Sequence, residues 1–124
     1  KRILVITGDG NFLMGLGSAI TALFYRPANL KILLLDNQQY YTTGGQPTIS
    51  SAINYPKFLD SLTGSYSCSK QATSESIMSD LLTFLEVNAF GILHLKISEA
   101  TKDFENIPWH PEEITERMVR RLTQ

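Results

Sequence analysis

Two short polar stretches follow two apolar runs near the start of the sequence. Gly8-Asp9-Gly10 comes just after the run 3–6, and Asp36-Asn37 comes directly after the run 31–35. Carboxylate and amide oxygens are ligands that Mg²⁺ and Ca²⁺ prefer, and Mg²⁺ usually completes its shell with water and phosphate. If the two runs form neighbouring strands, the polar stretches predict a metal site ligated by oxygen.

The segment after Asp9 favours a phosphate at the same place. Apolar residues recur at near-helical spacing over 12–25, so we expect one helix there, capped by Asn11 and ended by Pro27. The amino end of a helix attracts phosphate, and Gly8 and Gly10 would let the backbone approach it closely. The stretch therefore predicts a metal-bridged diphosphate.

Other phosphate and metal motifs fit this stretch poorly. The segment that begins at Gly8 lacks the third glycine of the dinucleotide fingerprint, and no Gly-Lys-Ser/Thr follows it as in a nucleotide P-loop. A calcium-binding loop is also disfavoured, because Leu13 and Ile20 stand where ligands are needed.

The whole chain alternates between strand and helix patterns. The elements 3–6, 12–25 and 31–35 have the size of a βαβ unit with parallel strands, and both strands are apolar enough to be buried on both faces. After a polar loop over 42–51, the remaining predicted elements are a helix begun by Asn54 that runs to 62, a strand 66–70, a helix from Thr73 or Ser74 to 87, a strand 91–97 and a helix from Pro111. This order predicts an α/β domain, with a doubly wound, mostly parallel sheet and ligands at the carboxyl ends of the strands.

His94 lies in the middle of the predicted strand 91–97. Alternation places it on the same face as Ile92 and Lys96. A buried structural role is the expectation for this histidine, rather than a catalytic one.

Size and composition limit the possible partners. The 124 residues suit one domain, 1–124, with 43% hydrophobic and 19% charged residues. A formal net charge of −1 argues against nucleic acid or an anionic membrane surface as a partner. Cys68 is the single cysteine, so we expect no internal disulfide and no cysteine-ligated cluster. We also expect a cytoplasmic location. No apolar run approaches the roughly 18 residues of a membrane span.

The chain enters its first strand directly after Lys1-Arg2, without an initiator methionine. We therefore expect it to be a fragment, or one half of a two-domain or two-subunit enzyme.

A family resemblance follows from two motifs. GDG at 8–10, with DN at 36–37, resembles the thiamine diphosphate motif of decarboxylases, transketolases and their relatives. The run LDNQQYYTTGGQPT at 35–48 is similar to the diphosphate-binding domain of phosphonopyruvate and sulfopyruvate decarboxylases, which share D-N-x-x-Y/H-x-x-T-G-G-Q-P-T. The closing IPWHPEEITERMVRRL at 107–122 is also similar to that group.

The resemblance implies a set of binding residues. The implied Mg²⁺ ligands are the side chains of Asp9 and Asn37 and the backbone carbonyl of Gln39. The residues implied to meet the cofactor are these three together with Gly8, Gly10, Asn11, Phe12, Tyr40, Tyr41 and Thr42. Tyr40 begins a loop, to Gln46, that matches the loop folding over the cofactor.

The resemblance also implies a function. The chain would be the diphosphate- and Mg²⁺-binding half of a thiamine diphosphate-dependent decarboxylase of a small anionic 2-oxo acid, such as phosphonopyruvate or sulfopyruvate. The cofactor carries the chemistry in such enzymes. The activating glutamate comes from a pyrimidine-binding domain or subunit, so no catalytic residue is assigned here and an oligomer is expected.

Two alternatives remain open. One is the β subunit of a 2-oxo acid:ferredoxin oxidoreductase, which has a similar T-G-G-Q loop. Those subunits often carry cysteine-ligated clusters, which a single cysteine disfavours. The other is a non-catalytic module that binds thiamine diphosphate.

Overall fold

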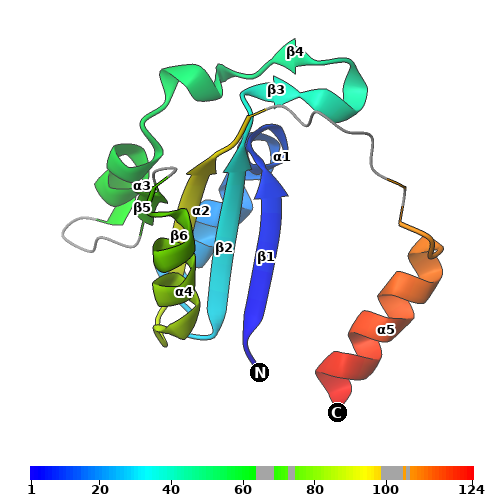
Figure 1. Ribbon diagram of the computed structural model, residues 1–124. Helices are drawn as coiled ribbons and strands as arrows, with labels where there is room; N and C mark the ends of the chain where they lie inside the picture. The colour runs from blue at the N-terminus through cyan, green and yellow to red at the C-terminus, as the bar shows by residue number, and fades with distance from the viewer. Residues whose placement is uncertain (64–68, 73–74, 99–104, 106) are drawn as a thin grey trace.

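The centre of the computed structural model, which describes residues 1–63, 69–72, 75–98, 105 and 107–124, is a four-stranded parallel sheet (Figure 1). Across the sheet the strands are β1 (Ile3–Gly8), β2 (Leu30–Asp36), β6 (Gly91–Lys96) and β5 (Ser69–Ala72). The helices are α1 (Asp9–Met14), α2 (Leu16–Tyr25), α3 (Tyr55–Thr63), α4 (Ile77–Glu86) and α5 (Pro111–Thr123). The predicted α/β class with a parallel sheet is confirmed.

Helices cover both faces of the central strands. On one face, α1, α2 and α3 pack on β2 and β6 around a core of Phe12, Ala19, Leu23, Ile32, Leu34, Tyr55, Leu59, Phe90 and Ile92. On the other face, α4 packs on a smaller core of Leu33, Leu93 and Leu95. Successive side chains of β2 therefore point alternately into the two cores, as expected for a strand between two layers of helices.

The register of β1 against β2 places the two polar stretches at one edge. The strands are parallel, Ile3 pairs with Leu30, and Gly8 pairs with Leu35. Asp9 and Asn37 follow these strand ends directly. The condition on which the predicted metal site depended, that the two strands are neighbours, is confirmed.

The expectation that the first strand is buried on both faces was wrong. Ile3, Leu4, Val5 and Ile6 are 36%, 42%, 41% and 61% exposed. The reason is position: β1 is an edge strand, and among the described residues it has a neighbouring strand on one side only. An apolar run does not distinguish an edge strand from a central one.

The first helix also differs from expectation. It begins at Asp9, not after Asn11, and Gly15 divides it into α1 and α2. The amino-terminal cap is Gly8, which offers no side chain, while Asn11 lies inside α1. The predicted end is confirmed, because Arg26 adopts a left-handed conformation (φ 47°) directly before Pro27.

A short hairpin crosses over the carboxyl edge of β1 and β2 (Figure 1). It consists of β3 (Gln39–Tyr40), a 3₁₀ turn at Tyr41–Thr43 and β4 (Gln46–Pro47), and a second 3₁₀ turn at Ile49–Ala52 follows. Gly44 and Gly45 both have positive φ, 128° and 76°, which explains the paired glycines at the tip. The predicted polar loop 42–51 therefore contains the tip and second strand of this hairpin and most of the second 3₁₀ turn.

The later elements agree with the prediction apart from their ends. Asn54 caps α3 as expected, since its Oδ1 accepts a hydrogen bond from the Lys57 amide at 3.1 Å. The predicted strand 66–70 is β5, at Ser69–Ala72. Residues 66–68 and the predicted caps Thr73 and Ser74 lie outside the described residues. Within the described chain, no helix is long and apolar enough to span a membrane.

The contribution of the larger core can be measured at Leu34. Its side chain is fully buried in the centre of β2. Leu34→Ala should lower the free energy of unfolding by about 2–5 kcal/mol, because it leaves a cavity that the packed helices cannot fill. Leu82→Ala on α4 is the control, since Leu82 is exposed, and should change it by less than about 0.5 kcal/mol. Urea unfolding compares the two, and equal losses would contradict this description of the core.

Candidate functional site

A cleft of about 360 Å³ lies at the carboxyl edge of β1 and β2. Its walls are the end of β1, the first turn of α1, the end of β2 and the hairpin. All the predicted cofactor-binding residues except Phe12 line it, namely Gly8, Asp9, Gly10, Asn11, Asn37, Gln39, Tyr40, Tyr41 and Thr42. Residues from two distant stretches of the sequence are therefore brought together in one concave site.

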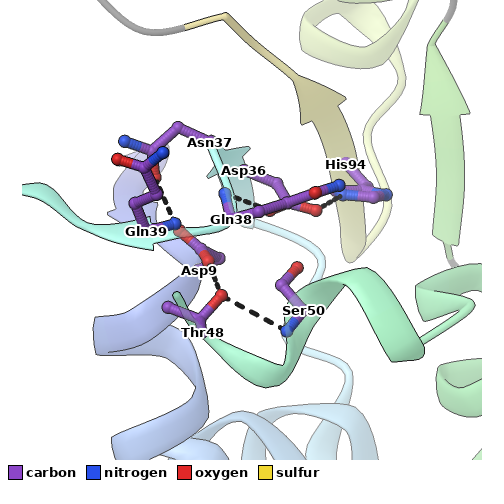
Figure 2. Close-up of polar contacts among 8 residues, drawn as sticks. All are labelled: Asp9, Asp36, Asn37, Gln38, Gln39, Thr48, Ser50 and His94. Carbon is purple, nitrogen blue, oxygen red and sulfur yellow. Dashed lines mark hydrogen bonds and ion pairs between the residues drawn. The ribbon is translucent and has the colours of Figure 1, made fainter. Parts of the chain in front are cut away.

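Asp9 is the first residue of α1 and is buried at the base of this site. The Thr48 hydroxyl donates a hydrogen bond to its Oδ2, as Figure 2 shows. The same hydroxyl oxygen accepts the Ser50 amide at 3.2 Å. Thr48 therefore fixes the plane of the Asp9 carboxylate and joins the hairpin to α1.

Two successive turns form the chain after β2. Asp36 Oδ1 accepts the Gln38 amide at 3.1 Å, and Asn37 Oδ1 accepts the Gln39 amide at 3.1 Å. Gln38, which lies between Asn37 and Gln39, adopts the left-handed conformation, with φ at 62°. Aspartate and asparagine favour such turns because their side chains bond to the backbone two residues on. The two turns bring Asn37 and Gln39 to the wall of the cleft.

The first turn of α1 offers backbone donors to the cleft. Within the described residues, no side chain caps this turn, and the amides of the first residues of a helix have no partner inside it. The Asn11 side chain does not cap the helix; its Nδ2 donates a hydrogen bond to Thr7 Oγ1 at 3.1 Å. Phe12 differs from the other predicted residues, because its side chain is buried in the core against Tyr55, with ring centroids 5.8 Å apart.

The hairpin lies close to α1 at Gly10. A side-chain carbon added there would overlap the Tyr40 ring. At Gly8, by contrast, the nearest atom would be the Leu35 carbonyl oxygen at 4.0 Å. Gly10 thus leaves room for the Tyr40 ring in its observed position, a role that the sequence did not reveal.

Sequence reasoning missed the polar residues beneath the cleft. His94 is buried on the sheet, as expected, but its Nε2 lies 2.8 Å from Asp36 Oδ2 (Figure 2). Tyr55 packs on the His94 ring with centroids 4.8 Å apart. Burial raises the pKa of Tyr55, and the charges of Asp36 and Asp9 raise it further, although the neighbouring Ser50 lowers it. The one sequence signal for this pair was that polar residues, His94 and Asp36, stand within or at the end of apolar runs that form buried strands.

Comparison with known proteins identifies the family. Residues 1–101 match the family model described as "Thiamine pyrophosphate enzyme, C-terminal TPP binding domain". The chain belongs to this family. Thiamine pyrophosphate and thiamine diphosphate are the same cofactor.

Relatives of this thiamine diphosphate-binding domain include named decarboxylases. It is 31% identical to the sulfopyruvate decarboxylase subunit beta of Methanothermobacter thermautotrophicus, over 98% of this chain and 63% of the relative. It is 37% identical to the phosphonopyruvate decarboxylase of Streptomyces viridochromogenes, over 83% of this chain and 26% of the relative. The chain therefore spans less than two thirds of the length of these relatives.

The fold has a counterpart among solved structures. It matches an X-ray structure of a protein named as a thiamin diphosphate-dependent enzyme, isolated from Mycobacterium smegmatis, with a TM-score of 0.61 and 16% identity. The match covers 81% of this chain and 18% of that protein. At this identity the likeness concerns the fold.

The site of the thiamine diphosphate-binding domain fits a diphosphate bridged by Mg²⁺. The oxygen atoms that the site could offer to a metal come from the Asp9 carboxylate, the Asn37 side-chain amide and backbone carbonyls. Such hard oxygens are the ligands that Mg²⁺ takes. No group of three or more His, Cys, Asp or Glu side chains that could hold a metal occurs within the described ranges. A cation here would therefore rely on Asp9, on Asn37 and carbonyl oxygens, and on oxygens of the diphosphate itself.

The contact between Gly10 and Tyr40 gives a test of the hairpin. Gly10→Ala should displace the Tyr40 ring, because the added methyl group occupies its place. We expect chymotrypsin, which cleaves after aromatic residues, to cut the hairpin faster in this variant. Gly17→Ala in α2 is the matched control, since its added carbon meets nothing within 4 Å. Equal cleavage of both variants and the wild type would show that the close approach is unimportant.

Proposed function

We propose that the chain is the diphosphate- and Mg²⁺-binding half of a thiamine diphosphate-dependent decarboxylase that acts on a small anionic 2-oxo acid. The substrate would be of the sulfopyruvate or phosphonopyruvate type, since relatives of the chain are named for these activities. A single observation carries the proposal: one cleft is lined by Asp9, Asn37 and Gln39 together with the uncapped first turn of α1.

The named relatives favour decarboxylation over the alternatives. Those reported above are decarboxylases, and none is named as an oxidoreductase or as a binding module without activity. The decarboxylase proposal therefore has specific support that the two alternatives lack.

The residues of the cleft would divide the work of holding the cofactor. Asp9, Asn37 and the Gln39 carbonyl would ligate Mg²⁺, and the backbone amides at the start of α1 would bind oxygens of the diphosphate. Tyr40, Tyr41 and Thr42 would cover the bound group from the hairpin. When bound, thiamine diphosphate supplies the electron sink for loss of CO₂. This chain would anchor and orient it.

The other half of the active site would come from a pyrimidine-binding domain or subunit. The relative from Methanothermobacter is named as a subunit beta, which supports a two-part arrangement. Asp9 has its role at the metal and Asp36 is paired with His94, so neither is placed to activate the cofactor. We propose a cytoplasmic oligomer in which the partner supplies the carboxylate that activates the cofactor.

Removing the charge of Asp9 tests the metal site. In the full-length protein with its pyrimidine-binding partner, Asp9→Asn keeps the shape and an oxygen for Thr48 but removes the charge. Affinity for thiamine diphosphate with Mg²⁺ should fall by more than about 100-fold. Loss of a residue that only hydrogen-bonds to a metal ligand typically costs about 10- to 100-fold, and loss of a ligand's charge should cost more. Asn37→Ala should weaken binding less, because water can replace one neutral ligand.

The measurement is calorimetric titration of the cofactor, together with the urea midpoint of each variant. Glu112→Gln is the control, since Glu112 is exposed on α5, outside the cleft. Wild-type affinity in Asp9→Asn would contradict the assignment of the metal ligand.

A second test concerns activity. The isolated chain with Mg²⁺ and thiamine diphosphate should release no CO₂ from sulfopyruvate or phosphonopyruvate, because it lacks the carboxylate that activates the cofactor. Addition of the pyrimidine-binding partner should produce turnover. CO₂ release by the isolated chain that the partner does not increase would contradict the division of the site.

A further inference from the structure

A buried aspartate–histidine pair lies directly under the chain that carries two of the proposed metal ligands. His94 comes from β6 and Asp36 ends β2, and each residue is 1% exposed. The two strands are adjacent, so His94 Nε2 reaches Asp36 Oδ2 at 2.8 Å. A carboxylate only accepts hydrogen bonds, so Nε2 of His94 carries the proton that is shared with Asp36.

Asp36 has more than one contact to the segment that turns into the site. Its Oδ1 accepts the Gln38 amide at 3.1 Å, and its backbone carbonyl accepts the Ile97 amide at 2.9 Å. The carboxylate is thus held on both sides, by His94 at one oxygen and by Gln38 at the other, as Figure 2 shows.

The turn that Asp36 holds is one the backbone does not favour by itself. Gln38 has φ at 62°, in the left-handed region that non-glycine residues seldom adopt. This conformation separates Asn37 from Gln39 and lets the Asn37 side chain accept the Gln39 amide. The position of both proposed ligands therefore depends on the turn, and the turn depends on the orientation of Asp36.

His94 is placed to fix that orientation. Within the described part of the chain its Nδ1 has no hydrogen-bond partner, so the bond to Asp36 is the ring's only described polar anchor. The Tyr55 ring packs against it at 4.8 Å and limits its movement. A purely structural pair at this depth would gain little, since well-packed apolar residues usually serve as well.

We propose that His94 is a positioning residue of the metal site, which acts through Asp36 and Gln38 to hold Asn37 and Gln39 where a divalent cation requires them. The inference deepens the proposed function and rests on it. Loss of such an outer partner typically weakens metal affinity about 10- to 100-fold.

Two amide substitutions of different reach separate positioning from packing. The terminal nitrogen of His94→Gln falls near the place of Nε2 and can still donate to Asp36. The side chain of His94→Asn is equally polar but too short to do so. Tyr55→Phe is the packing control, because it alters the same buried cluster and, among the described residues, Tyr55 makes no hydrogen bond to Asp36.

The measurement uses the full-length protein with its pyrimidine-binding partner. Mg²⁺ is titrated at saturating thiamine diphosphate by calorimetry, and the urea midpoint of each variant is recorded. We expect His94→Asn to raise the apparent Kd for Mg²⁺ at least tenfold, His94→Gln to stay within about threefold, and Tyr55→Phe to match the wild type. If His94→Asn does not fold, Asp36→Ala replaces it, with the same loss expected, because it removes the acceptors for both His94 and the Gln38 amide.

The outcomes distinguish the two levels of the proposal. Equal Mg²⁺ affinity in the wild type and in the His94→Asn or Asp36→Ala variant would overturn the positioning role alone. The same loss in His94→Gln and Tyr55→Phe as in His94→Asn would also overturn it, because packing would then explain the effect. A wild type without Mg²⁺-dependent cofactor binding would overturn the proposed function, and this inference with it.

Discussion

The parallel pairing of β1 with β2 is the constraint on which the site depends. Gly8 lies opposite Leu35, so the chain leaves both strands at the same level, with Asp9 on one side and Asn37 on the other. A slip of one residue would turn every side chain of β1 to the opposite face. The helices packed on β2 fix the two faces of that strand, because Leu34 and Ile32 belong to one core and Leu33 to the other. The site thus inherits its geometry from the packing of the sheet.

The hairpin is the second part of this arrangement, and two contacts join it to α1. The Thr48 hydroxyl bonds to Asp9, and the Tyr40 ring lies where only a glycine at position 10 leaves room. The Thr48 amide also donates to the Gln38 carbonyl at 2.9 Å, which ties the end of the hairpin to its beginning. The loop that follows Asn37, a proposed metal ligand, is in this way closed on itself and fixed to the helix that carries Asp9, the other proposed side-chain ligand.

The sequence predicted the parts of the site that follow from local pattern. Polar residues at the ends of two apolar runs, with a helix between them, require Asp9 and Asn37 to meet if the strands are parallel neighbours. The pair of Asp36 and His94 was beyond reach, because 58 residues separate them and the contact depends on β6 lying next to β2. The exposure of β1 depends on strand order as well. The break at Gly15 was missed because the apolar spacing continues across it.

The two buried carboxylates of the site, Asp9 in the cleft and Asp36 beneath it, differ in how their charges are compensated. The carboxylates of Asp9 and Asp36 are both buried, and beyond the effect of burial the charge of each raises the pKa of Tyr55. Burying a charge is costly unless it is paired. Asp36 has His94 and the Gln38 amide, whereas Asp9 has the neutral Thr48 hydroxyl. In the proposed site, the weaker compensation at Asp9 would favour a cation beside it, and a diphosphate would in turn offset the charge of that cation. The same burial that makes the site costly to fold would make it selective for a metal-bound anion.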